Sequence, residues 1–152
     1  MADFMQDQIL QAFKQTLIQA ATAAGTRVRI EGVDMRSALA TPGIDIEAGD
    51  EEVAAVSMGA GQTGARTLMR EFRVEVHGVI ATASDDYRTQ ASSLHQQIER
   101  ALLSASPTFL DAVLRERPRL MGIRPDKDGE GSKVVYVMRS MWLCKYSAKE
   151  GA

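Results

Sequence analysis

Residues 66–105 restrict the possible folds more than any other part of the chain. Apolar and polar residues alternate through Arg66–Ala81, and a period of two places successive side chains on opposite faces of a β-strand. Through Asp86–Ala105 the apolar residues recur every three or four positions, which indicates an amphipathic helix. The expected strand has an apolar face of Phe72, Val74, Val76 and Ile80 and a solvent-facing polar face of Arg73, Glu75 and His77. This order predicts a sheet with a helix lying across it.

Shorter periodic segments on both sides extend this unit to one domain. The expected helices are one from Asp3 to Gly25, the long one capped by Ser84 or Asp85, and a short one beginning at Ser106 and Pro107. The further strands are Val28–Ile30, Ile44–Ala48, Val53–Met58, Arg119–Arg124 and Lys133–Tyr146, with turns at Gly49–Glu52 and Asp126–Gly131. We predict a single α/β (α+β) domain over residues 1–146, with a mixed, mainly antiparallel sheet of four to five strands and helices packed on one face. Residues 147–152 are expected to form a disordered tail.

The composition of the chain excludes several classes of function. The net charge of −2 does not favour nucleic acid as a partner. No segment approaches the roughly 18 consecutive apolar residues of a membrane span, and the N-terminus lacks the pattern of a signal peptide. The single cysteine, Cys144, excludes an intrachain disulfide, and no Cys-His-acid set accompanies it. We expect Cys144 to be a small buried residue.

A glycine-rich segment at residues 57–65 formally matches a nucleotide-binding motif. Gly59, Gly61 and Gly64 give the pattern G-x-G-x-x-G, but that motif must open a helix, and here a strand follows. A phosphate-binding Walker loop is excluded as well, because Ala65 and Arg66 stand where its lysine and hydroxyl residue would be. The segment is therefore predicted to be a mobile loop that becomes ordered on assembly.

Two charged clusters also invite functional interpretations. The carboxylates of Asp50, Glu51 and Glu52 lack metal-ligand spacing and a nearby histidine, so a solvated turn is favoured over a metal site. We predict no catalytic residue, metal or cofactor. The basic cluster consists of Arg115, Arg117, Arg119 and Arg124. It indicates either contact with an acidic partner surface or DNA, or a solvated helix end whose cations the helix dipole favours.

The last strand is apolar on both faces, which is unexpected for a strand covered on one side only. We predict that one face meets the helices and that the other meets a neighbouring subunit. The candidate contact residues on this strand are Met138, Met141 and Trp142.

Over nearly the whole chain, the order of elements resembles the tail terminator family of long-tailed bacteriophages, the family of the lambda minor tail protein U. The resemblance depends on four stretches: the opening helix ending in AATAAGTRVRIEG, the segment ATPGIDIEAGDEEV, the core REFRVEVHGVIATASDDYRTQASSLHQQIERALL and the closing strand VVYVMRSMWLCKY. It implies an α/β protomer that forms a homohexameric ring on the finished tail tube, stops tube polymerisation and presents a surface for joining the head. The implied partners are other copies of the chain, the tail tube protein, a head–tail connector or neck protein, and DNA passing through the ring lumen.

The resemblance also implies a location at the head-proximal end of the virion tail, and in the host cytoplasm before assembly. An alternative from the same setting is a neck or head-completion protein, which also forms a ring. An enzyme is not favoured, because no paired carboxylates, metal cluster or activated nucleophile is apparent. The residues expected at contacts are Gly59, Gly61, Gly64, Arg66, Arg70, Met138, Met141 and Trp142.

Overall fold

The computed structural model describes residues 2–31, 42–56, 67–82, 85–104, 109–128 and 134–149. These ranges form helix α1 (Ala2–Gln19), strands β1 (Val28–Ile30), β2 (Gly43–Val56) and β3 (Thr67–Thr82), helix α2 (Tyr87–Leu102), the 3₁₀-helix η1 (Phe109–Ala112), and strands β4 (Arg119–Asp128) and β5 (Val134–Lys149). The five strands form one sheet in the order β1-β2-β3-β5-β4. β1 pairs with β2 in parallel, and the other three pairs are antiparallel. The predicted α+β fold with a mixed, mainly antiparallel sheet is therefore confirmed.

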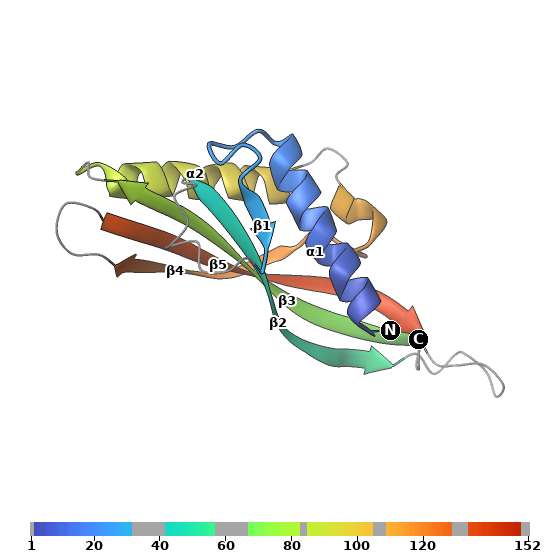
Figure 1. Ribbon diagram of the computed structural model, residues 1–152. Coiled ribbons are helices and arrows are strands. Elements are labelled where there is room, and N and C mark those ends of the chain that lie inside the picture. Colours follow the sequence, from blue (N-terminus) through green and yellow to red (C-terminus); the bar gives the residue numbers. More distant parts are fainter. Residues whose placement is uncertain are drawn as a thin grey trace, which may run out of the picture.

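All the described helices pack on one face of the sheet (Figure 1). The apolar face predicted for the long strand is confirmed, because Phe72, Val74, Val76 and Ile80 are buried on β3. They form one core with Ile9, Phe13 and Leu17 of α1 and with Ala91, Leu94 and Ile98 of α2. Cys144 is buried in the same core, as expected. Burying this area of apolar side chains supplies the main driving force for docking the helices on the sheet.

The crossing of α2 over β3 depends on Gly78. A Cβ atom at this position would lie 3.2 Å from Cδ2 of Leu94 and 3.4 Å from Cδ1 of Ile98. Carbon atoms in favourable contact are about 3.5–4.0 Å apart. The missing side chain therefore allows the helix to approach the strand closely.

The acidic segment at residues 49–52 is not a turn, contrary to the prediction. β2 runs unbroken from Gly43 to Val56 and changes register between Ala48 and Glu51. The extra residue of such a bulge reverses the alternation, so the period-two pattern ends although the strand continues. Cross-strand ion pairs then accommodate the carboxylates: Glu51 lies 3.1 Å from Arg70, and Glu52 lies 3.6 Å from Arg73.

The last two strands are longer than predicted. β4 continues beyond Arg124 to Asp128, and β5 ends at Lys149, so Ser147–Lys149 belong to the sheet and not to a disordered tail. Pairing of Thr67 with Lys149 at the end of β3 explains the extension. Backbone hydrogen bonds hold these residues in the strand whatever the polarity of their side chains.

The helix ends also differ from the predictions. α1 ends at Gln19, before Gly25, and Ala21 is the first residue after it with a positive φ, at 53°. The N-cap of α2 is Asp86, whose carboxylate accepts a hydrogen bond from Nε2 of Gln90 at 2.7 Å. The predicted cap Ser84 and the predicted helix start at residues 106–107 lie outside the described residues.

Candidate functional site

The face of the sheet opposite the helices carries a concentration of charged side chains. We call it the helix-free face, because every helix in the described ranges lies on the other side (Figure 1). Side chains alternate along β3, so Glu75 and His77 lie on this face while Val76 is buried in the core. The pairing register places Asp45 of β2 and Arg139 of β5 on either side of His77.

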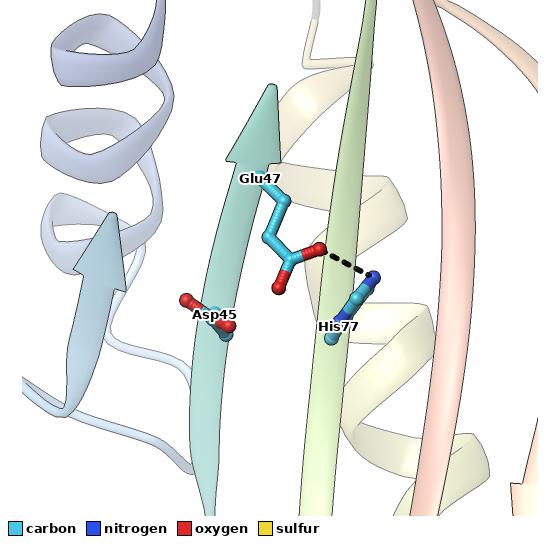
Figure 2. A group of neighbouring side chains, drawn as sticks. All are labelled: Asp45, Glu47 and His77. Carbon is cyan, nitrogen blue, oxygen red and sulfur yellow. Dashed lines mark ion pairs between the residues drawn. The ribbon is translucent and has the colours of Figure 1, made fainter. Parts of the chain in front are cut away.

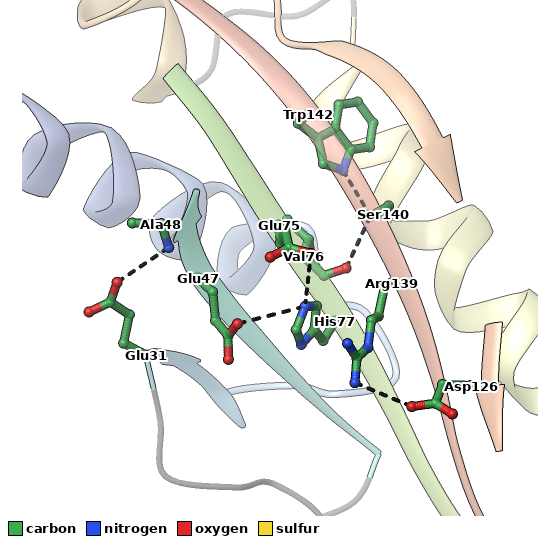
Figure 3. Close-up of polar contacts among 10 residues, drawn as sticks. All are labelled: Glu31, Glu47, Ala48, Glu75, Val76, His77, Asp126, Arg139, Ser140 and Trp142. Carbon is green, nitrogen blue, oxygen red and sulfur yellow. Dashed lines mark hydrogen bonds and ion pairs between the residues drawn. The ribbon is translucent and has the colours of Figure 1, made fainter. Parts of the chain in front are cut away.

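His77 is buried, although the strand pattern predicted a solvent-facing side chain. Its exposed fraction is 8%. Its Nε2 atom lies 4.0 Å from Oε2 of Glu47 and 3.9 Å from Oε1 of Glu75, too far for a hydrogen bond, and has no hydrogen-bond partner (Figure 3). Burial lowers the pKa of His77 below its ordinary value, although both glutamates act in the opposite direction.

Asp45, Glu47 and His77 form a compact group (Figure 2). One potential ligand atom from each residue lies within 4.8 Å of the others. Asp45 and Glu47 are two positions apart on β2, so they share a face, and Asp45 pairs directly with His77. Within the described residues, this is the one group of three or more histidine, cysteine or acidic side chains with a spacing suited to a metal ion.

A second set of polar groups, linked by hydrogen bonds, is buried in the core on the helix side of the sheet (Figure 3). Nε1 of Trp142 donates to Oγ of Ser140 at 2.9 Å, and Oγ of Ser140 donates to the carbonyl oxygen of Val76 at 3.1 Å. Trp142 is fully buried, with an exposed fraction of 0%. Its expected role as a contact residue is therefore corrected: the even-numbered residues of this part of β5 face the helices.

The other predicted contact residues are distributed over different environments. Gly59, Gly61, Gly64 and Arg66 lie outside the described residues. Arg70 is half-buried, and its guanidinium pairs with Glu51, whose carboxylate also accepts the hydroxyl hydrogen of Tyr146. Met138 is half-buried opposite Gly78 on the helix side. Met141 is 38% exposed on the helix-free face.

Met141 borders a depression of about 270 Å³ between β4 and β5. β4 changes register between Leu120 and Gly122, and the bulge leaves Met121 unpaired and 48% exposed. The two methionines line this depression together with Glu75 and Arg139. The depression thus combines flexible apolar side chains, which adapt to many partner surfaces, with charges of both signs.

The basic cluster does not converge on one point. Arg115, Arg117, Arg119 and Arg124 are all exposed. Arg115 is held against the end of β5, where its backbone N–H donates to the carbonyl oxygen of Lys145 at 3.0 Å. Arg124 lines the depression, and its partner in the pairing register is Arg139. Arg115, Arg119 and Arg124 therefore lie at different positions along β4 and β5.

Sequence reasoning missed the group around His77 because its members come from two strands. The signal that could have located it is the spacing of Asp45 and Glu47 at alternate positions of one strand, facing the polar side of the next strand. That signal becomes specific only when the register between β2 and β3 is known.

None of the helices in the described residues is both long and apolar enough to cross a membrane. No protein-family model matches the chain, and no curated protein sequence matches it. Among solved structures, 23 chains are similar to it. One is part of the virion of a native gene transfer agent (GTA) particle, with 16% sequence identity, coverage of 85% of this chain and 84% of that chain, and a TM-score of 0.39. Similarity at this level establishes no function for the chain.

Proposed function

We propose that the protein is a structural component of a bacteriophage-type virion. It caps the tail tube as a ring, ends tube polymerisation and presents the surface to which the head is joined. The observation that carries this proposal is the exposure of large apolar side chains on both sides of the sheet; besides Val53 of β2, they lie in the two places described next. The order of elements along the chain, which resembles tail terminators, supplies the specific role.

The first of these places is the strand patch, Met121 and Met141 on β4 and β5, which are 48% and 38% exposed. The second is the helix patch, Leu103 and Phe109 at the end of α2 and the start of η1, which are 42% and 43% exposed. A cyclic ring joins two different surfaces of each protomer, head to tail. Two unlike apolar patches suit such a contact better than a two-fold dimer, in which one patch would meet itself.

The lengths of the elements also suit an assembling protein. β3 and β5 each have 16 residues, as α2 does. A strand rises about 3.3 Å per residue, giving roughly 50 Å, whereas a helix of this length spans roughly 24 Å. The strands are therefore longer than α2, and a second helix, α1, covers a further part of the same face (Figure 1). The helix-free face is left open along the strands for neighbouring subunits or a tail tube.

The role on the tail is tested by removing the protein during assembly and measuring tails by electron microscopy. Loss of a terminator leaves the tube free to polymerise, so we expect tails longer than normal. Tails of normal length accompanied by unjoined heads would contradict this role and favour a neck or head-completion protein. Immunogold labelling of complete particles should place the protein at the head-proximal end of the tail.

The ring contact is tested with Met141→Asp and Phe109→Asp, which each place a carboxylate in one patch. Gln96→Asp, which adds the same charge at an exposed position of α2, is the matched control. We expect Gln96→Asp to assemble normally and each patch variant to fail. If the contact is head to tail, the two failing variants retain one complementary pair of surfaces and should form a 1:1 dimer when mixed. Normal ring assembly by both patch variants would refute these surfaces as the contact.

A further inference from the structure

The helix-free face contains one polar group that the proposed ring does not use. His77 is more than nine-tenths buried, and its Nε2 atom lies 3.9–4.0 Å from two carboxylates without a hydrogen bond to either. A buried polar atom without a partner has lost its hydrogen bonds to water, and a bound ligand would replace them. Figure 2 shows the Nε2 edge of the ring turned toward the carboxylate of Glu47.

The charges around His77 give a second, independent indication of a missing cation. Glu47 and Glu75 are paired directly across β2 and β3, and like charges in this position repel each other. The other such pair, Glu52 with Glu71, is relieved by Arg73, which lies 3.6 Å from Glu52. The described ion pairs of Glu47 and Glu75, by contrast, are both with His77.

Arg139 lies on the far side of His77, and its own ion pair is with a different carboxylate. Its guanidinium lies 3.2 Å from the carboxylate of Asp126 (Figure 3). Glu47 and Glu75 therefore face each other across the two strands beside the imidazole of His77.

We propose that Asp45, Glu47 and His77 bind one divalent transition-metal ion between β2 and β3. One ring nitrogen of His77 and one carboxylate oxygen from each acid are the ligand atoms, and they already lie within 4.8 Å of one another. Metal–nitrogen and metal–oxygen bonds of about 2.0–2.2 Å separate neighbouring ligand atoms by roughly 3.0–3.5 Å. Separations of up to 4.8 Å must therefore shorten by at most roughly 1.3–1.8 Å, which is less than about an ångström for each of the two atoms. Flexible carboxylate side chains can make shifts of this size.

The ligand chemistry selects the class of metal. Imidazole nitrogen suits Zn²⁺, Ni²⁺, Cu²⁺ or Fe²⁺, whereas Mg²⁺ and Ca²⁺ prefer oxygen ligands alone. Three protein ligands leave a fourth position, which Glu75 at 3.9 Å from His77 is placed to approach. The ion would join two neighbouring strands and neutralise the Glu47–Glu75 repulsion, independently of the proposed ring.

The test uses the full chain after treatment with a chelator, with Zn²⁺ as the calorimetric probe and Co²⁺ as the spectroscopic one. We expect one Zn²⁺ per chain, and visible Co²⁺ absorption bands characteristic of nitrogen and oxygen ligands. His77→Gln and Glu47→Gln each remove a ligand. Affinity should fall by more than the roughly 10- to 100-fold that loss of a supporting residue outside the ligand shell causes.

The chain provides a matched control in its only other histidine, His95, which is also buried and lies 3.6 Å from Glu99. His95→Gln should bind Zn²⁺ as the unchanged chain does. Binding that survives His77→Gln, binding lost equally in His95→Gln, or the absence of a one-to-one complex would each overturn the proposal. If His77→Gln does not fold, the Glu47→Gln variant decides, because its side chain is 41% exposed and its replacement leaves the core intact.

Discussion

The contact between α2 and β3 provides the most direct test of the packing, through the substitution Gly78→Ala. The new Cβ would lie 3.2 Å from Cδ2 of Leu94 and 3.4 Å from Cδ1 of Ile98, so both methyl groups must move by a few tenths of an ångström. Both side chains are 1% exposed and have little space to move into. Overpacking of this kind costs about 1–3 kcal/mol. Alanine also restricts the unfolded chain, which offsets about 0.4–1 kcal/mol.

The net expectation for Gly78→Ala is a loss of about 1 kcal/mol in the free energy of unfolding, or roughly 2–4 °C in Tm. Gly78→Val adds two more methyl groups at the same place and should cost more than the alanine. Gly122→Ala is the matched control, because a Cβ there meets no atom within 4 Å. Urea unfolding followed by tryptophan fluorescence measures all three variants. If Gly78→Ala is as stable as Gly122→Ala, the close helix–strand contact is refuted.

Two further predictions concern buried polar groups. Burial raises the pKa of Tyr146 to about 12, whereas a hydrogen bond donated by Lys127 lowers the pKa of Tyr87. The stabilisation linked to Tyr146 is complete below its unfolded pKa of about 10 and is lost as the pH rises toward 12. Absorbance at 295 nm should therefore show Tyr87 ionising before Tyr146, and Tyr146 ionising together with unfolding. Simultaneous ionisation of these two tyrosines in the folded protein would contradict this order. Ser140→Ala leaves the indole N–H of Trp142 buried without its acceptor. In urea titrations this substitution should lower the free energy of unfolding by about 1–3 kcal/mol. A change below about 0.5 kcal/mol would show that another group can replace this hydrogen bond.

The sequence predicted the fold well where one local period governs a whole element. The alternation around Val76 and the helical period around Leu94 both located core faces correctly, because each pattern records burial directly. Prediction failed where pairing between strands decided the outcome. The bulge after Ala48 inserts one extra residue and so turns Glu51 toward the core-facing side of the sheet. No local period in the sequence signals such a register change.

The candidate site was less predictable for the same reason. The burial of His77 depends on what lies beside it on β2 and β5, and alternation assigns a side chain to a face without telling whether that face is covered. Of the residues expected at contacts on β5, Met141 is exposed and Trp142 is not, because the alternation places them on opposite sides of the sheet.

The two apolar faces of β5 can now be assigned separate causes. On the helix side, the apolar residues of β5 belong to the core. On the helix-free face, Val137 pairs with Val79 of β3, and both are buried, with exposed fractions of 3% and 2%. Packing within the chain therefore accounts for this part of the second face, and a neighbouring subunit is not needed to explain it. Met141 is different, because it stays 38% exposed beside Met121, which the β4 bulge supplies. A contact on this face must accordingly include β4, the edge strand, and not β5 alone.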